Sequence, residues 1–172
     1  MKKFASEAEM QEKFNEFLHD TLLQEEDIYL ENELKGLVGI PDVVVYEKRN
    51  IYVNYVLSIE LKLKNWQRAL VQAYKYSSFS NMTFAIMDEA TMAPALKNII
   101  EFEHANVGLA SFNIYKELKI YFVPEEKAPF SKRLMYRFLE MMTNKSIEKK
   151  LYSNCSKLIY PTIRNIYENT EL

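Results

Sequence analysis

The chain has 172 residues, of which 48% are hydrophobic and 13% aromatic, and its formal net charge is −2. This composition excludes an intrinsically disordered chain, and the length is enough for one domain with a full core. The single cysteine excludes an intramolecular disulfide, and the sequence shows neither a signal peptide nor an apolar run of membrane-spanning length. We therefore expect a cytoplasmic protein without a membrane partner.

The first part of the chain is predicted to form a helix and three strands. Over residues 4–23, side chains recur at helical spacing and define one buried face. The residues of that face are Met10, Phe14, Phe17, Leu18 and Thr21. Strands are predicted over 28–34 and 40–46, and a turn over 47–50 leads into a long strand over 51–63.

The rest of the chain is predicted to alternate between helices and strands. The predicted elements are a helix over 65–79 with Asn65 as its N-cap, a strand over 83–87, a helix over 93–103, strands over 107–112 and 118–123, a helix capped by Ser131, and a final helical stretch over 146–170. This order indicates an α/β fold in which a mixed central β-sheet is flanked by helices. We expect a single domain over 1–172, with a core of about 1–124 and a helical extension of about 125–172.

Two carboxylates and an amine mark the most informative stretch of the sequence. Pro41-Asp42 stands 18 positions ahead of Glu60-Leu61-Lys62. Because side chains alternate along a strand, Glu60 and Lys62 are predicted to share its wetter face, with an apolar floor behind them. Carboxylate oxygens suit a hard divalent cation, and an amine can orient a water molecule against a phosphate.

The distance between the two carboxylates depends on the register of a hairpin. A turn centred near residues 49–50 pairs residue 42 with about residue 57, and twist or a bulge could close the remaining offset. Asp42 and Glu60 could then share one Mg²⁺, with the Leu61 carbonyl as a further oxygen ligand. The alternative is structural, because a Pro-Asp pair often opens a strand and Glu-x-Lys is often an exposed ion pair.

The helix predicted after Lys62 carries a polar stripe. Arg68, Gln72 and Tyr76 stand at i, i+4 and i+8, and a neighbouring stripe of alanines permits close approach to the sheet. Gln72 and Tyr76 should therefore face the carboxylates. Lys64 and Arg68 flank Trp66 and could contact phosphate, while Trp66 either stacks on a base or, as we favour, anchors the helix to the core.

Taken together, these motifs resemble those of the PD-(D/E)xK nuclease superfamily, which has the restriction-endonuclease-like fold. The resemblance is carried by Pro41-Asp42, Glu60-Leu61-Lys62 and Gln72-Ala73-Tyr74-Lys75-Tyr76. The Gln-Ala-x-x-Tyr helix is similar to that of the branch with Holliday-junction resolvases and many repair and phage-defence nucleases. The stretch from His104 to Leu109 also resembles a later strand entry of that branch.

The resemblance implies roles for individual residues. Asp42 and Glu60 would be metal ligands, Lys62 would position the attacking water, and Gln72 would support the site or touch the phosphate backbone. The family also has an earlier acidic residue, for which this sequence offers four candidates: Glu12, Glu16, Glu31 and Glu33. Glu12 and Glu16 lie opposite the apolar stripe of the first helix, which indicates solvation, so we favour Glu33, with Glu31 on the same face.

The expected function is metal-dependent hydrolysis of DNA phosphodiester bonds, with Mg²⁺ or Mn²⁺ as cofactor. A homodimer or a partner protein could supply specificity to so short a chain. The alternative is a catalytically inactive nuclease-like scaffold that binds nucleic acid or a protein, which the acidic pI of about 5.8 keeps open. The intact set of Asp42, Glu60 and Lys62 favours the enzyme.

Overall fold

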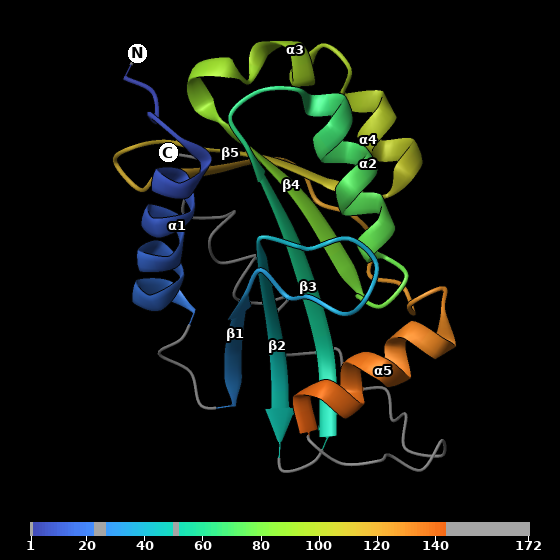
Figure 1. The fold of residues 1–172 in the computed structure, drawn as a ribbon. Helices are drawn as coiled ribbons and strands as arrows, with labels where there is room; N and C mark the ends of the chain where they lie inside the picture. Colours follow the sequence, from blue (N-terminus) through green and yellow to red (C-terminus); the bar gives the residue numbers. More distant parts are fainter. Residues whose placement is uncertain (1, 23–26, 50–51, 144–172) are drawn as a thin grey trace.

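The computed structural model describes residues 2–22, 27–49 and 52–143, and it confirms the predicted α/β class. Six strands form one sheet in the order in which they occur along the chain (Figure 1). They are β1 (Ile28–Asn32), β2 (Val43–Arg49), β3 (Tyr52–Lys62), β4 (Met82–Asp88), β5 (Gly108–Phe112) and β6 (Leu118–Phe122). The sheet is mixed, because β3 runs parallel to β4 and β4 to β5, whereas the other neighbours are antiparallel.

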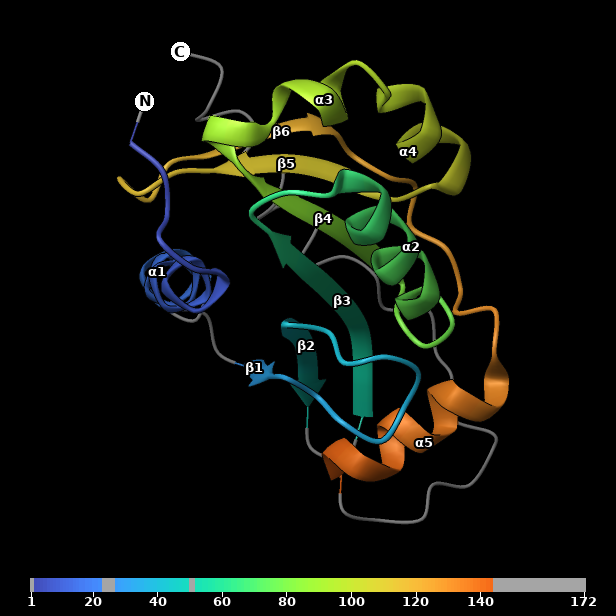
Figure 2. The ribbon, with the colours of Figure 1, turned by 45° about the horizontal axis from the view of Figure 1, so that its top comes forward.

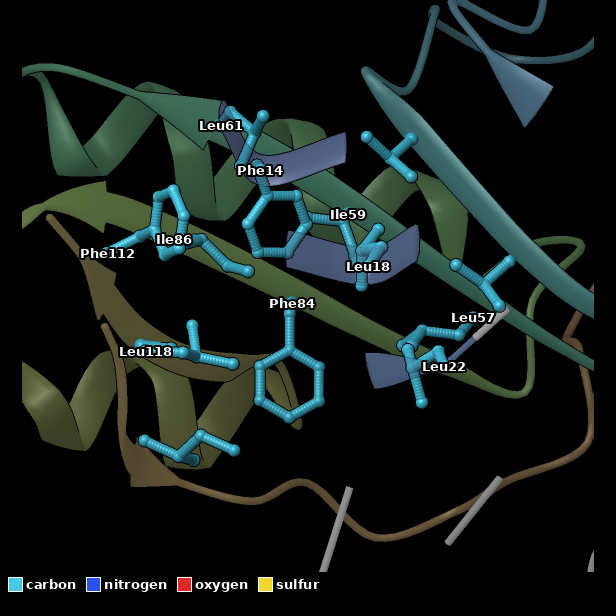
Figure 3. Packing of buried hydrophobic residues seen from close by; sticks show 14 of the residues in the cluster. Phe14, Leu18, Leu22, Leu57, Ile59, Leu61, Phe84, Ile86, Phe112 and Leu118 are labelled. Carbon is cyan, nitrogen blue, oxygen red and sulfur yellow. The ribbon is translucent and has the colours of Figure 1, made fainter. Parts of the chain in front are cut away.

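Helix α1 (Glu7–Thr21) covers one face of the sheet. Ser6 caps it by accepting a hydrogen bond from the backbone N–H of Glu9, and Met10, Phe14 and Leu18 are buried as predicted. Their partners are apolar side chains of β3 to β6, several of which Figure 3 shows around Phe14 and Leu18: Leu57, Ile59, Leu61, Phe84, Ile86, Phe112 and Leu118. Thr21 was predicted on this face and is instead exposed, because the helix ends there and its hydroxyl donates to the Phe17 carbonyl.

The opposite face is covered by four further helices. These are α2 (Trp66–Tyr76), α3 (Ala93–Leu96), α4 (Ile99–Ala105) and α5 (Lys132–Thr143). Ala69 and Ala73 are fully buried, so α2 approaches β3 and β4 closely, as the small-residue stripe predicted. Helix α5 packs Phe138 onto β2 and β3, so the described part of the predicted extension belongs to this layer.

Several element boundaries differ from the predictions. The helix expected over 93–103 is divided into α3 and α4, because the Asn98 side chain donates to the Pro94 carbonyl and competes with helix continuation. A turn was expected from residue 47, but β2 continues to Arg49. The final helix predicted over 146–170 lies outside the described residues. Within the described ranges, each helix is too short or too polar to cross a bilayer.

Candidate active site

The β2–β3 register brings Asp42 next to the end of β3. Val43 pairs with Ile59, and a bulge between Glu47 and Lys48 supplies part of the offset that the simple hairpin lacked. Asp42 therefore stands just before β2 and opposite Glu60. Its Oδ2 accepts a hydrogen bond of 2.7 Å from the backbone N–H of Leu61. The structure thus brings together the two carboxylates that the sequence predicted as neighbours.

Glu60 is buried, with only 1% of its surface exposed, so the prediction of a wetter face is wrong at this position. The reason is that α2 lies across this side of β3 and covers it. Both carboxylate oxygens have partners: the Tyr76 hydroxyl donates to Oε2 at 2.7 Å, and Lys62 Nζ lies 2.8 Å from Oε1. A buried carboxylate is thereby held in one orientation by two charge-assisted hydrogen bonds.

The ammonium of Lys62 lies among three oxygen atoms. Besides Glu60 Oε1, it is 3.2 Å from the carbonyl oxygen of Leu61 and 3.3 Å from Oε2 of Glu7. Burial acts to lower the pKa of Lys62, but the hydrogen bond and charge of Glu60 and the nearby charges of Asp42 and Glu7 raise it above its ordinary value. Lys62 is therefore a cation at neutral pH.

Asp42 is the member of the carboxylate pair whose negative charge is less well stabilised. Burial and the negative charge of Glu60 raise the pKa of Asp42 to about 6, although the hydrogen bond from Leu61 and the charge of Lys62 act in the opposite direction. Two carboxylates close together repel each other unless a cation lies between them. A carboxyl group whose pKa is raised by burial and by a neighbouring carboxylate is a candidate functional residue, and Asp42 meets both conditions.

Tyr76 connects helix α2 to the site through its hydroxyl group. Its hydroxyl lies 3.0 Å from the carbonyl oxygen of Ile40 as well as beside Glu60, so its single proton is shared between two acceptors. Burial and the neighbouring Glu60 raise the pKa of the Tyr76 hydroxyl, which keeps it neutral and a donor. The prediction that Tyr76 faces the carboxylates agrees with this geometry.

Gly39 is the position that lets the loop before β2 approach Tyr76. Its φ is +66°, and a Cβ atom there would stand 2.9 Å from Cε1 of the Tyr76 ring. We expect Gly39→Ala to lower the free energy of unfolding by about 1–3 kcal/mol, because the residue is both strained and in contact with a buried ring. Thermal or urea unfolding measures this, and Gly36→Ala, which also has a positive φ but meets no atom closer than 3.6 Å, is the matched control. Equal losses in the two variants would contradict the role of the Tyr76 contact.

The remaining residues predicted to contact the substrate lie on α2 or just before it. Gln72 accepts a hydrogen bond of 3.2 Å from Arg68 Nε and also contacts the Tyr76 hydroxyl. Lys64 and Arg68 line a cleft of about 420 Å³ together with Lys62 and Glu7. Trp66 is partly buried and packs against Phe102, which agrees with its interpretation as an anchor of the helix.

The acidic residue that reaches the site from α1 was not among the four candidates. Glu33 is exposed, and it is its backbone N–H that contacts Asp42, at the carbonyl oxygen. The other candidates lie elsewhere: Tyr46 donates to Glu31, Lys116 pairs with Glu16, and Glu12 is exposed on α1.

Glu7 instead contacts Lys62, and Gln11, one turn later, donates a hydrogen bond of 3.0 Å to the Asp42 carbonyl. The signal in the sequence was the i, i+4 spacing of Glu7 and Gln11 in the first turns of the helix.

The described residues contain no group of three or more His, Cys, Asp or Glu side chains placed to hold a metal ion. Asp42 and Glu60 are a pair of carboxylates, and the backbone carbonyl of Leu61 lies 3.2 Å from Lys62 Nζ, which also contacts Glu60. Such a set resembles the protein ligands of a magnesium site, in which one or two carboxylates bind the ion and water and substrate phosphate complete its coordination.

Comparisons with known proteins do not place the chain in a family. No protein-family model matches it, and no curated protein matches its sequence. Among solved structures, the fold is similar to that of the SPO1766 protein of unknown function from Silicibacter pomeroyi, with a TM-score of 0.47 and 14% identity, over 80% of this chain and 94% of that one. A likeness at this level carries no inference about activity.

Proposed function

We propose that this chain is a Mg²⁺- or Mn²⁺-dependent nuclease of the PD-(D/E)xK type that hydrolyses DNA phosphodiester bonds in the cytoplasm. The observation that supports this most is the convergence of Asp42, Glu60 and Lys62 at the end of β3. The same end of the strand opens into the cleft lined by Lys64 and Arg68, where a phosphate backbone could lie.

The oxygen atoms at this point suit a hard cation. The Lys62 ammonium lies within 2.8–3.3 Å of Glu60 Oε1, the Leu61 carbonyl and Glu7 Oε2, so these oxygens already surround one positive charge. Asp42 carries a further carboxylate whose charge is poorly compensated. We assign Asp42, Glu60 and the Leu61 carbonyl as the residues that would hold the ion, with Glu7 next to them.

When bound, the divalent ion would lower the pKa of a water molecule and offset charge on the phosphate. The side chains of the protein would orient the reacting groups. Tyr76 holds the Glu60 carboxylate in one orientation, and Lys62 donates hydrogen bonds that orient the attacking water and stabilise the pentavalent phosphate. Water adds to phosphorus, the bond to the 3′ oxygen breaks, and that oxygen takes up a proton. Arg68 and Lys64 would hold the neighbouring phosphates, and a second subunit or a partner protein would supply specificity.

A nuclease-like scaffold without activity is the second candidate. The observation that favours it is that both oxygens of Glu60 already have protein partners, as in a buried polar cluster that serves only stability. The two candidates differ in what the site does with a divalent ion.

Metal dependence separates the two candidates. We expect the full chain to cut supercoiled plasmid or single-stranded DNA with Mg²⁺ or Mn²⁺ and to stop when EDTA is added. Agarose and denaturing gels detect the cutting, and calorimetry with MnCl₂ measures binding of the ion without DNA. Mn²⁺ binding together with metal-dependent cutting supports the enzyme. If the protein neither binds Mn²⁺ nor cuts plasmid, single-stranded DNA or RNA, the scaffold is the correct reading.

A further inference from the structure

The solvent-facing side of α2 bears positive charge and ends at an exposed aromatic pair. Arg68 and Lys75 lie seven residues apart on one face of the helix, and both are exposed. The sequence from Lys62 to Met87 contains no Asp or Glu, so no acidic residue of this stretch offsets them. At the end of the helix, the Tyr74 and Phe130 rings lie 6.0 Å apart and are 50% and 63% exposed.

The aromatic pair is built by two segments that main-chain hydrogen bonds hold together. The backbone N–H of Phe130 donates to the Ser77 carbonyl at 3.2 Å, and that of Ser131 donates to the Ser78 carbonyl at 3.1 Å. These bonds fix the segment before α5 against the C-terminal end of α2, where Figures 1 and 2 both place it. Two large rings are thus presented to solvent on a rigid base, which is unusual for side chains that serve packing alone.

Positive charge continues beyond the aromatic pair onto α5. A groove of about 720 Å³ lies along this helix and is lined by Lys132, Arg133, Tyr136, Arg137 and Glu140. Three of these side chains are basic and one is acidic. The basic surface therefore runs from the cleft at Lys62, along α2, past the two rings and onto α5.

We propose that this surface, the α2–α5 track formed by Arg68, Lys75, Tyr74, Phe130 and Arg133, binds an unpaired nucleic-acid strand. Its basic side chains complement phosphates, and the two rings offer a platform on which one unpaired base stacks. In a duplex the bases are stacked on each other and present no free face to such a platform. The 11 residues of α2 span about 16 Å, which is the length of several nucleotides at about 3.4 Å or more each.

An unpaired strand would be the substrate class of the proposed nuclease. Only one part of the inference rests on that proposal, namely that the bound strand leads toward Lys62. Strand binding itself does not need a divalent ion. It can therefore be measured in EDTA, where no cutting occurs, and its outcome is independent of whether the site is catalytic.

The test is fluorescence anisotropy of the full chain in EDTA with labelled strands of about 20 nucleotides, as single-stranded DNA, single-stranded RNA and blunt duplex DNA. We expect a single strand to bind more tightly than the duplex, and Tyr74→Ala and Phe130→Ala each to weaken single-strand binding by about tenfold. Tyr74→Phe, which keeps the ring, should bind as the wild type does. The DNA and RNA arms show which strand is preferred.

Two controls make the result specific to the track. Tyr115 is 65% exposed at the turn between β5 and β6, so Tyr115→Ala removes an equally exposed ring elsewhere and should leave binding unchanged. Lys75→Gln should lower the magnitude of the slope of log affinity against log salt concentration by about one, because one phosphate contact is lost. Circular dichroism and melting temperature verify that the variants fold.

Equal binding of duplex and single strand, equal losses in Tyr74→Ala and Tyr115→Ala, or no binding of any strand would each overturn the inference. Ring-dependent strand binding in a protein that never cuts would keep the inference and refute the nuclease. Metal-dependent cutting that Tyr74→Ala and Phe130→Ala leave intact, with unchanged affinity, would keep the nuclease and refute the track.

Discussion

Lys62→Met is expected to lower the rate of DNA cleavage at saturating Mg²⁺ by about 100- to 1,000-fold, the usual loss when one oriented charge donor is removed from a transition state. Methionine keeps much of the length of the side chain but has no ammonium to orient water or stabilise the phosphate. Single-turnover cleavage of a labelled strand measures the chemical step apart from product release. Lys97→Met removes an exposed lysine beyond α3 and should cut at the wild-type rate.

The same substitution leaves Glu60 buried with one of its two partners missing, which costs about 3–5 kcal/mol in comparable pairs. Lys62→Arg should therefore be measured beside Lys62→Met. Arginine restores the positive charge, but its planar guanidinium cannot occupy the position of the compact ammonium. We expect this variant to fold and still to cut at least 100-fold more slowly. A folded Lys62→Arg or Lys62→Met protein that cuts at the wild-type rate would show that Lys62 serves stability and not the reaction.

The architecture and most of the carboxylate site follow from local patterns. Alternation placed Glu60 and Lys62 on one face of β3, and the stripe of Ala69 and Ala73 correctly predicted which face of α2 meets the sheet. These patterns report on neighbours along one strand or one helix, and a single sequence contains that information.

Contacts between distant segments could not be predicted in the same way. Glu60 is buried because α2 crosses over it. Glu7 reaches Lys62 because of the way α1 lies against β3, and the packing of Phe14 and its neighbours determines that position. Glu33 was favoured because it was expected on the strand before Pro41, within reach of the metal, but its position just after β1 leaves the side chain exposed. The bulge that sets the position of Asp42 likewise emerges only when β2 and β3 pair.

Asp42→Asn is expected to make the metal-free protein more stable at neutral pH while abolishing binding of Mn²⁺. The asparagine side-chain oxygen can still accept the hydrogen bond from the Leu61 N–H, so the change removes charge with little change of shape. Each pKa unit corresponds to about 1.4 kcal/mol. The rise of the Asp42 pKa to about 6 therefore predicts a gain of about 1–3 kcal/mol, with the lower value favoured because the carboxyl is partly exposed.

The sign of this effect follows from linkage. The pKa of Asp42 is higher in the folded protein than in the unfolded chain, so folding favours its protonated form. The stability that this group contributes is complete below about pH 4 and is lost as the pH rises through about 6. In EDTA, the difference in unfolding free energy between Asp42→Asn and the wild type should thus grow from pH 4 to pH 7 and then level off. Because other carboxylates titrate in both proteins, the difference is the quantity to measure.

Addition of Mn²⁺ should reverse the order of the two proteins. A ligand that binds the folded state stabilises it by mass action, so the wild type should gain in melting temperature as MnCl₂ rises, while Asp42→Asn should not. Asp20→Asn neutralises an exposed carboxylate on α1 and serves as the control for nonspecific ion binding. If Asp42→Asn is less stable than the wild type in EDTA at pH 8, the Asp42 charge is well compensated by the protein alone. In that case the repulsion between Asp42 and Glu60 provides no driving force for a cation, and the metal site would have to be abandoned.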